Sequence, residues 1–279
     1  MAVSLVSGCM RQDSILYYDN ITFKPLIGHD TRAVESVPFP KDRTFAVWAV
    51  TDNNKVYIEE EQISYSNEWK SVRKWDSEKL NFHACWPMDI GMSLSEQNGL
   101  QLKGFDCRQG DVDILVARGY GSPNDDDEVV LQFDHILSRV EFRMLHSLAE
   151  SMKVRLKKIE MIGFAGEGDY NTICEDDWST NKFDFSYVVY DAGDGEGIEI
   201  QGGIPQYIGE DFYVIPQLCD ASLRVTYDVR YGTANWIPQS EEIEHLETYW
   251  EPSKHYTYTI NLCMNSLKHT TGISSWDNR

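Results

Sequence analysis

Apolar and polar residues alternate along several stretches of the chain, which is the pattern of a β-strand with one buried face. Residues 222–231 and 255–262 alternate most regularly. Their apolar positions are Leu223, Val225, Tyr227, Val229 and Tyr231, and then Tyr256, Tyr258, Ile260 and Leu262. Polar residues, mostly arginine, threonine, aspartate and asparagine, fill the positions between them. Both segments are therefore predicted to be antiparallel strands that bury one face and expose the other.

Shorter runs rich in β-branched and aromatic residues predict further strands. These runs are 45–50, 80–85, 113–117, 129–133, 139–144 and 212–215. Residues 146–162 fit either an amphipathic helix or a loop followed by a strand whose alternation slips at Lys157 and Lys158, as a β-bulge would make it slip. We favour the loop and strand, which leaves hardly any helix. Short strands joined by polar turns indicate an all-β fold of the β-sandwich type.

Residues 121–128 (GSPNDDDE) form the clearest break in this pattern, because glycine, proline, asparagine and a run of acidic residues separate two strand-like segments. Each half of the chain also contains an apolar strand that ends in proline, at residues 82–87 and again at 212–216. We therefore expect two similar sandwiches in tandem rather than one large unit.

The net charge of the chain limits the classes of partner that it can bind. Asp and Glu number 45 against 25 Lys and Arg, which gives a net charge of -20. Binding to nucleic acid and direct attraction to an anionic membrane both depend on clustered Lys and Arg. We therefore expect no nucleic-acid partner. No apolar run approaches the length of about 18 residues that predicts a membrane-spanning helix.

The sequence lacks the motifs by which enzymes are usually recognised. It contains no G-x-S-x-G elbow, no P-loop, no HExxH and no dinucleotide-binding glycine loop between a strand and a helix. Residues 191–197 (DAGDGEG) match a calcium loop only faintly, since Gly193 and Gly195 stand where oxygen ligands are needed. No two cysteines have the spacing of a metal or redox motif. We expect a protein that is not an enzyme, with no catalytic residue, no cofactor and no metal.

The start of the chain carries a short lipidation motif. Val6, Ser7 and Gly8 precede Cys9 in the order branched apolar, small, small, cysteine, and a polar stretch that suits a tether follows. A complete export signal also has a basic start and an apolar core of about 7–15 residues. Either the natural chain begins upstream or the match is accidental. We expect Cys9 to carry a lipid anchor.

The order of several short motifs along nearly the whole chain resembles the fimbrillins of the FimA/Mfa-like superfamily, the subunits of type V pili in Bacteroides-type bacteria. The matching motifs are Cys9, 21–23 (ITF), 31–33 (TRA), 45–49 (FAVWA), Trp69, Trp75, 80–84 (LNFHA) with Pro87, 131–140 (LQFDHILSRV), 212–217 (FYVIPQ), 223–227 (LRVTY), Trp250, 256–260 (YTYTI) and 273–276 (ISSW). No single motif is specific, and their order carries the resemblance.

The resemblance implies two tandem transthyretin-like antiparallel β-sandwich domains. Residues 1–32 would hold the lipobox remnant, a tether and a removable first strand, residues 33–124 the N-terminal domain, and residues 125–279 the C-terminal domain. It also implies a fimbrial subunit or tip adhesin that is exported as a lipoprotein to the outer membrane. Its partners would be other pilus subunits, and it would touch the membrane only through the lipid anchor.

Assembly in that family implies a protease site and an exchanged strand. The matching cut lies between Arg32 and Ala33, with Arg43 as the second choice. The cut would remove the strand that contains Ile21, Thr22 and Phe23, and a strand donated by the next subunit would take its place. Little sequence follows Trp276, so shaft, tip and anchor roles all stay open, as do the surface ligand and its receptor.

A rival interpretation from the residues is a monomeric surface lipoprotein that binds carbohydrate. The chain has 8 Trp and 15 Tyr, and exposed aromatic rings can form a platform on which sugar rings stack. In sandwiches most such residues lie in the core, so the fimbrial interpretation is favoured.

Overall fold

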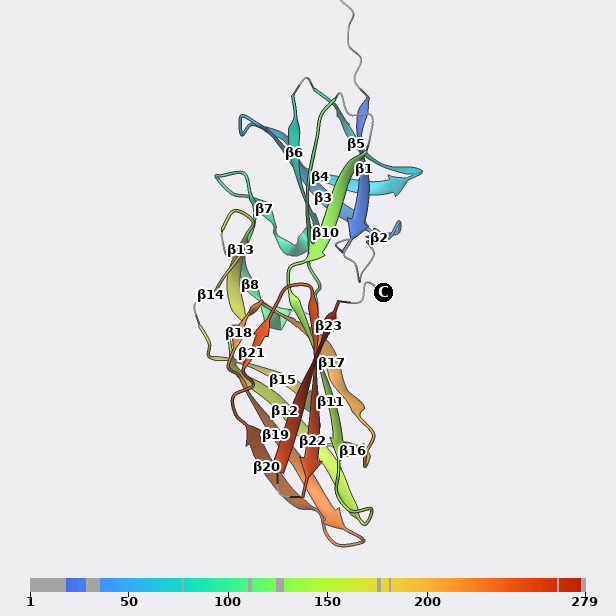
Figure 1. Cartoon of the computed structure of the whole chain (residues 1–279), viewed down its shortest axis with the longest axis vertical. Coiled ribbons are helices and arrows are strands. Elements are labelled where there is room, and N and C mark those ends of the chain that lie inside the picture. The colour runs from blue at the N-terminus through green and yellow to red at the C-terminus, as the bar shows by residue number, and fades with distance from the viewer. Residues whose placement is uncertain are drawn as a thin grey trace, which may run out of the picture.

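The computed structural model describes residues 19–28, 36–76, 78–109, 112–123, 128–174, 177–180, 182–264 and 266–276. Within these ranges the chain forms twenty-three strands and two short 3₁₀ turns, η1 (Met88–Ile90) and η2 (Cys107–Gln109), and no α-helix. The expectation of an all-β sandwich-like fold is confirmed. The molecule is elongated, with early strands at one end and late strands at the other (Figure 1).

The first sheet has eight strands in the order β10-β9-β6-β3-β4-β5-β1-β2, and β1 also pairs with β10. This second pairing closes the sheet on itself around a core. The strands are β1 (Asn20–Ile27), β2 (Val37–Pro38), β3 (Thr44–Thr51), β4 (Val56–Ser66), β5 (Glu68–Lys74), β6 (Leu80–Trp86), β9 (Leu115–Gly121) and β10 (Val129–His135). The core is dominated by buried aromatic rings, namely Phe23, Phe39, Phe45, Trp69, Phe82 and Phe133.

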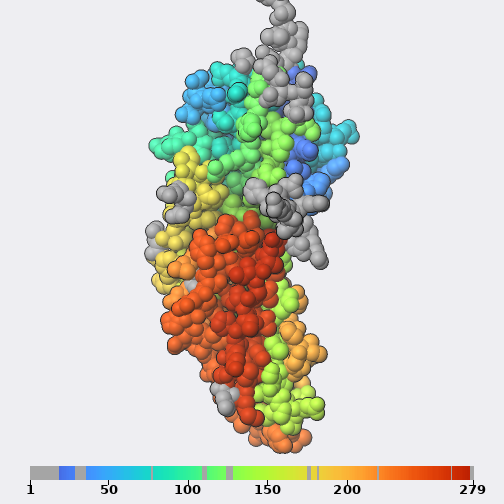
Figure 2. Space-filling view, viewed as in Figure 1, coloured from blue at the N-terminus to red at the C-terminus, as the bar shows by residue number. Residues whose placement is uncertain are grey.

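Two further sheets face each other in the other half of the molecule. One has the order β17-β11-β22-β23, and the other has the order β15-β12-β19-β20 with β16 paired to β12. The strands are β11 (Ser138–His146), β12 (Met152–Phe164), β15 (Phe185–Asp191), β16 (Ile198–Ile200), β17 (Gln206–Val214), β19 (Ser222–Tyr231), β20 (Ile237–Ile243), β22 (Lys254–Cys263) and β23 (Ser266–Ser275). Side chains from both sheets share one core. In the space-filling view β23 runs along this half towards the middle of the molecule (Figure 2).

A smaller sheet joins the two halves of the chain. Its order is β14-β13-β8-β7, so β8 from the first half pairs with β13 from the second. The strands are β7 (Ser93–Leu94), β8 (Leu100–Asp106), β13 (Glu167–Asn171) and β14 (Trp178–Thr180), and a separate ribbon pairs β18 (Gln217–Cys219) with β21 (Thr248–Trp250). A third core of buried residues, which includes Trp48 and Tyr170, lies between this sheet and the outer face of the first sheet.

Strand pairing does not follow the expected break at residues 121–128. β10 comes after that break but pairs with β9 and β1 in the first sheet. The chain enters the second pair of sheets only at β11. The expected division into residues 33–124 and 125–279, and the transthyretin-like character of each half, stay predictions.

The regular sequence patterns correspond to real strands. β19 and β22 cover the two segments of strongest alternation, and Leu223, Val225 and Tyr227 are buried while Tyr231 is 67% exposed. The segment 146–162 is a loop followed by β12, and the register of β12 against β19 shifts between Leu156 and Lys158. The predicted loop, strand and bulge are confirmed.

Candidate functional site

The first strand, β1, buries every second side chain in the core of the first sheet. Ile21, Phe23, Pro25 and Ile27 are buried, whereas the residues between them are partly or fully exposed. This alternation is what a strand with one face on a core requires. The strand that the sequence identified through Ile21, Thr22 and Phe23 is therefore an integral part of the first sheet.

β1 has strand neighbours on both of its edges. Along one edge it runs parallel to β10, with Phe23–Ile27 opposite Val129–Phe133. Along the other edge it runs antiparallel to β5 over its first half and to β2 at its end. Because it closes the gap between β5 and β10, β1 is the strand whose absence would turn a closed sheet into an open one.

Phe23 is the central side chain of this contact. Its ring meets the ring of Phe82 at 5.6 Å and that of Phe45 at 6.4 Å between centroids, both edge to face. It is fully buried. Burial of one such ring contributes about 1.5–3 kcal/mol, and aromatic pairs add about 0.5–1.5 kcal/mol. β1 is thus held by packing as well as by main-chain hydrogen bonds.

The other predicted site residues are described only in part. Cys9, Arg32 and Ala33 lie outside the described residues. Arg43 lies on the exposed turn before β3, where its main-chain N–H donates to the Pro40 carbonyl at 3.1 Å. Its guanidinium group lies 4.4 Å from the centroid of the Trp86 ring.

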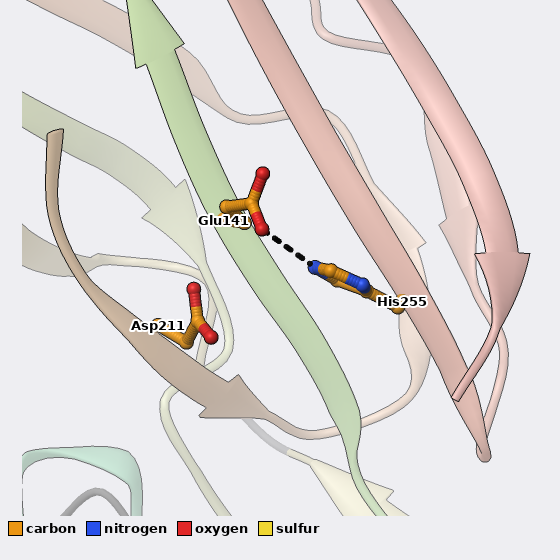
Figure 3. Close-up of side chains that lie close together, drawn as sticks. All are labelled: Glu141, Asp211 and His255. Atoms are coloured by element: carbon orange, nitrogen blue, oxygen red, sulfur yellow. Dashed lines mark ion pairs between the residues drawn. The ribbon is translucent and has the colours of Figure 1, made fainter. Parts of the chain in front are cut away.

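A second group of polar residues lies on β11, β17 and β22, on the sheet that carries β23. Glu141, Asp211 and His255 bring one ligand atom each within 4.8 Å of one another (Figure 3). Glu141 is only 4% exposed. The Nε2 atom of His255 lies 3.4 Å from a Glu141 oxygen but makes no hydrogen bond. No sequence motif indicates this cluster, because its members come from three strands that are far apart in the chain.

The cluster is an ion-pair network rather than a metal centre. Arg143 donates from Nε to Glu141 at 2.6 Å, and Arg139 donates from Nε to Asp211 at 2.9 Å. Each carboxylate is therefore already neutralised by a guanidinium group, and a bound cation would be repelled by both arginines. Burial, followed by the charge of Arg139, lowers the pKa of His255 below its ordinary value of 6.5.

The two halves of the molecule meet around Trp276. Its indole stacks on the His135 imidazole at 4.0 Å and lies parallel to the Tyr213 ring at 5.3 Å. His135 ends β10 in the first sheet, whereas Tyr213 belongs to β17. Trp276 is 7% exposed, and its main-chain N–H donates to the Ser253 carbonyl at 3.2 Å. Trp276, the residue after β23, thus attaches that strand to the contact between the two halves of the molecule.

Solved structures share this fold across nearly the whole chain. A fimbrial protein from Bacteroides vulgatus superposes with a TM-score of 0.64 at 14% identity, over 92% of this chain and 100% of that one. Putative cell adhesion proteins from Bacteroides ovatus and Bacteroides uniformis give TM-scores of 0.58 and 0.57 at 13% and 12% identity. They match 94% and 92% of this chain and 99% and 98% of their own. At such low identity these likenesses establish the fold alone.

The sequence itself matches a described family. No curated protein matches the chain. Among the described residues no helix is long and apolar enough to cross a membrane. The profile of the family described as fimbrillin-like matches residues 31–276, a range that begins after β1. That match covers most of the sequence, and the chain therefore belongs to the fimbrillin-like family.

Proposed function

We propose that this protein is a fimbrial subunit or tip adhesin at the cell surface, without enzymatic activity, that joins its neighbours by strand addition. The observation that carries the proposal is the position of β1. It fills a slot between β5 and β10 with the side chains of Ile21, Phe23, Pro25 and Ile27. An open slot of this kind offers unpaired main-chain groups and apolar pockets at alternate positions, which is what an incoming strand recognises.

In this proposal a protease opens the slot by cutting between Arg32 and Ala33. Such a cut would separate β1 from the rest of the chain while leaving β2 and the buried ring of Phe39 in place. A cut at Arg43 would also detach Phe39, whose ring packs on Phe45 at 5.3 Å and on Phe133 at 5.0 Å. The loss of that ring would damage the pockets that a new strand has to fill, so Arg32 is the better site.

Export as a lipoprotein through Cys9 is part of the same proposal. A diacylglycerol group on Cys9 would anchor the protein at the outer membrane, and the polar stretch that follows it (MRQDS) would serve as its tether. The cut after Arg32 would then release the subunit from that anchor. Its partners would be other pilus subunits.

Limited proteolysis of the full chain with an arginine-specific protease tests the proposal. We expect a product that begins at Ala33, followed by a ladder of oligomers in unheated gel samples. The variant Arg32→Gln should abolish both, whereas the matched variant Arg43→Gln should change neither.

A synthetic peptide of the β1 sequence, NITFKPLI, tests the same proposal by competing for the open slot. Added in excess during proteolysis, it should suppress the ladder, and a control peptide with Asp in place of the Phe23 equivalent should not. The proposal fails if no cut falls between Cys9 and Phe45, or if the cut protein stays monomeric at all concentrations.

A further inference from the structure

A cleft of about 900 Å³ lies where the first sheet, the small sheet and the β18–β21 ribbon meet. Its volume falls within the range of about 300–1,000 Å³ that is typical of small-molecule sites, and such sites favour junctions of this kind. The cleft lies on the opposite face of β10 from the core ring of Phe133, so that it does not overlap the slot of β1. It therefore offers this protein a binding site that is independent of strand addition.

One wall of the cleft is apolar and solvent-exposed. Leu218 and Tyr249 are direct register partners in the β18–β21 ribbon and are 71% and 57% exposed. Phe183, in the loop before β15, adds a third apolar side chain that is 56% exposed. Large apolar side chains that are exposed to water are unfavourable, and on most protein surfaces they occur singly. Three of them along one cleft indicate a surface that contacts a ligand.

The β18–β21 ribbon, which carries Tyr249, is held in place by buried side chains on its opposite face. Its other face carries Gln217 and Trp250, which are both buried. Gln217 accepts a hydrogen bond from the Ala165 N–H at 2.7 Å and donates one to the Ala165 carbonyl at 2.8 Å. Trp250 donates from Nε1 to the Tyr258 hydroxyl at 3.0 Å. The apolar wall is therefore preorganised, which reduces the entropic cost of binding.

The facing wall carries polar groups of both signs. Arg118 and Gln132 are register partners on β9 and β10, and Asp134 follows on the same face of β10. Asp177 precedes β14 and also lines the cleft. Burial raises the pKa of the Tyr170 phenol between these walls, and the nearby carboxylates of Asp177 and Asp134 raise it further.

This combination selects among ligand classes. Two carboxylates, in a chain of net charge -20, repel anions such as sulfated or sialylated glycans. An apolar peptide side chain offers no hydrogen-bonding group to Arg118, Asp134 or Asp177, so that its binding would displace water from these charged groups without replacing it. Sugar hydroxyls donate to carboxylates and accept from guanidinium groups, and the C–H faces of a sugar ring pack on aromatic rings. A neutral sugar satisfies both walls at once.

We propose that this cleft binds a short neutral oligosaccharide, whose rings stack on Tyr249 and Phe183 and whose hydroxyls bond to Arg118, Asp134 and Asp177. The size of the cleft suits several sugar rings rather than one. The surface ligand of this protein is then a neutral glycan. The proposal does not rest on strand addition, because no residue of β1 contributes to the cleft.

The test uses the full chain on an array of neutral, sialylated and sulfated oligosaccharides, followed by calorimetry with the neutral oligosaccharide that gives the strongest signal. We expect neutral members alone to bind. Tyr249→Ala and Phe183→Ala should each weaken that affinity at least tenfold, and Asp177→Asn should weaken it as well. Tyr231→Ala is the matched control, because Tyr231 is 67% exposed and lies outside the cleft. It should change the affinity less than twofold.

Unfolding midpoints of all four variants accompany these measurements, since every altered side chain is exposed and the fold should tolerate its loss. The proposal is overturned by an array that stays blank at millimolar glycan, by a preference for sulfated or sialylated members, or by affinity that survives both Tyr249→Ala and Phe183→Ala. A failure here leaves the oligomer ladder of the proteolysis experiment unaffected, so that the two proposals are distinguished.

Discussion

The first and last described strands, β1 and β23, are attached to the molecule in opposite ways. β1 has eight residues, four of them buried, and strand partners on both edges. β23 has ten residues, none of them buried, and within the described part of the chain its one strand partner is β22. Main-chain pairing is thus extensive in both strands, but β1 buries four side chains in a core, whereas β23 contributes only the partly buried Leu267 to one.

This difference separates two kinds of terminal strand. Removal of β23 would expose the edge of β22 and would uncover little of the core, since Leu267 is the one residue of β23 that packs against it. Removal of β1 would expose two edges and the pockets of Ile21, Phe23 and Ile27 together. Only a slot of the second kind gives an incoming strand both hydrogen bonds and apolar burial, so affinity for a donated strand should reside at β1.

The largest effect is expected from Phe23→Ala. Loss of a fully buried ring should lower the free energy of unfolding by about 3–5 kcal/mol. The matched change on the other strand, Ile273→Ala, removes a side chain that is 60% exposed and should cost less than about 0.5 kcal/mol. Urea unfolding of both variants measures the difference. Equal costs would mean that the two strands are coupled to the fold in the same way.

A somewhat smaller effect is expected at the attachment point of β23. Trp276→Ala removes a buried indole from between His135 and Tyr213 and should cost about 3 kcal/mol. Trp276→Phe keeps a stacking ring and should recover part of that loss. Urea unfolding measures the stability of both variants, and the ring resonances of His135 in NMR report the loss or retention of stacking. If Trp276→Ala is as harmless as Ile273→Ala, β23 is not fastened at the junction.

Protonation of His255, on the strand next to β23, is expected to lower the stability of the protein at acidic pH. His255 lies opposite Ser274 in the β22–β23 pairing, and burial together with Arg139 holds its pKa below 6.5. The unfolded chain therefore binds a proton more readily than the folded one. Stability should be constant above pH 6.5 with respect to this group and should fall as the pH drops from 6.5 towards the lowered folded value.

Unfolding midpoints in urea at pH 7.5 and pH 5.5 measure this fall. The variant His255→Gln cannot take up the proton and should show a smaller fall than the parent protein. An identical fall in both proteins would assign the acid sensitivity to other groups.

The smallest effect is expected in thiol reactivity, which tests whether the loss of β1 disturbs only its own slot. Burial raises the pKa of Cys85 to about 12, and Cys174 is exposed. Iodoacetamide at pH 8 should label Cys174 quickly and Cys85 only after unfolding. Cys85 faces the core beneath the small sheet rather than the slot. It should therefore stay protected in protein cut after Arg32, as read by peptide mass spectrometry, and rapid labelling there would mean that the whole sheet opens.

The sequence predicted the strands whose pattern is local. Alternation located β19 and β22 closely, and the irregularity at Lys157 and Lys158 located the bulge of β12, because burial of one strand face repeats every second residue. The order of short motifs identified the family, which the match over residues 31–276 confirms.

Other features have no local signal. The pairings of β1 with β10 and of β8 with β13 join residues far apart in the chain, so nothing near either strand reveals its partner. Glu141 occupies a polar position of an alternating strand and reads as exposed, yet neighbouring strands cover it. Phe183 and Tyr249 look like ordinary core aromatics until the fold brings their exposed rings to one cleft.

The parallel pairing of β1 with β10 also sets an order of events when the chain is made. β1 can find β5 once residue 74 has been synthesised, but its other edge stays open until residues 129–133 emerge. Pairing across so many residues is slow, because a long loop has to close before the contact forms. The newly made protein therefore passes through a stage in which its first sheet is incomplete at one edge.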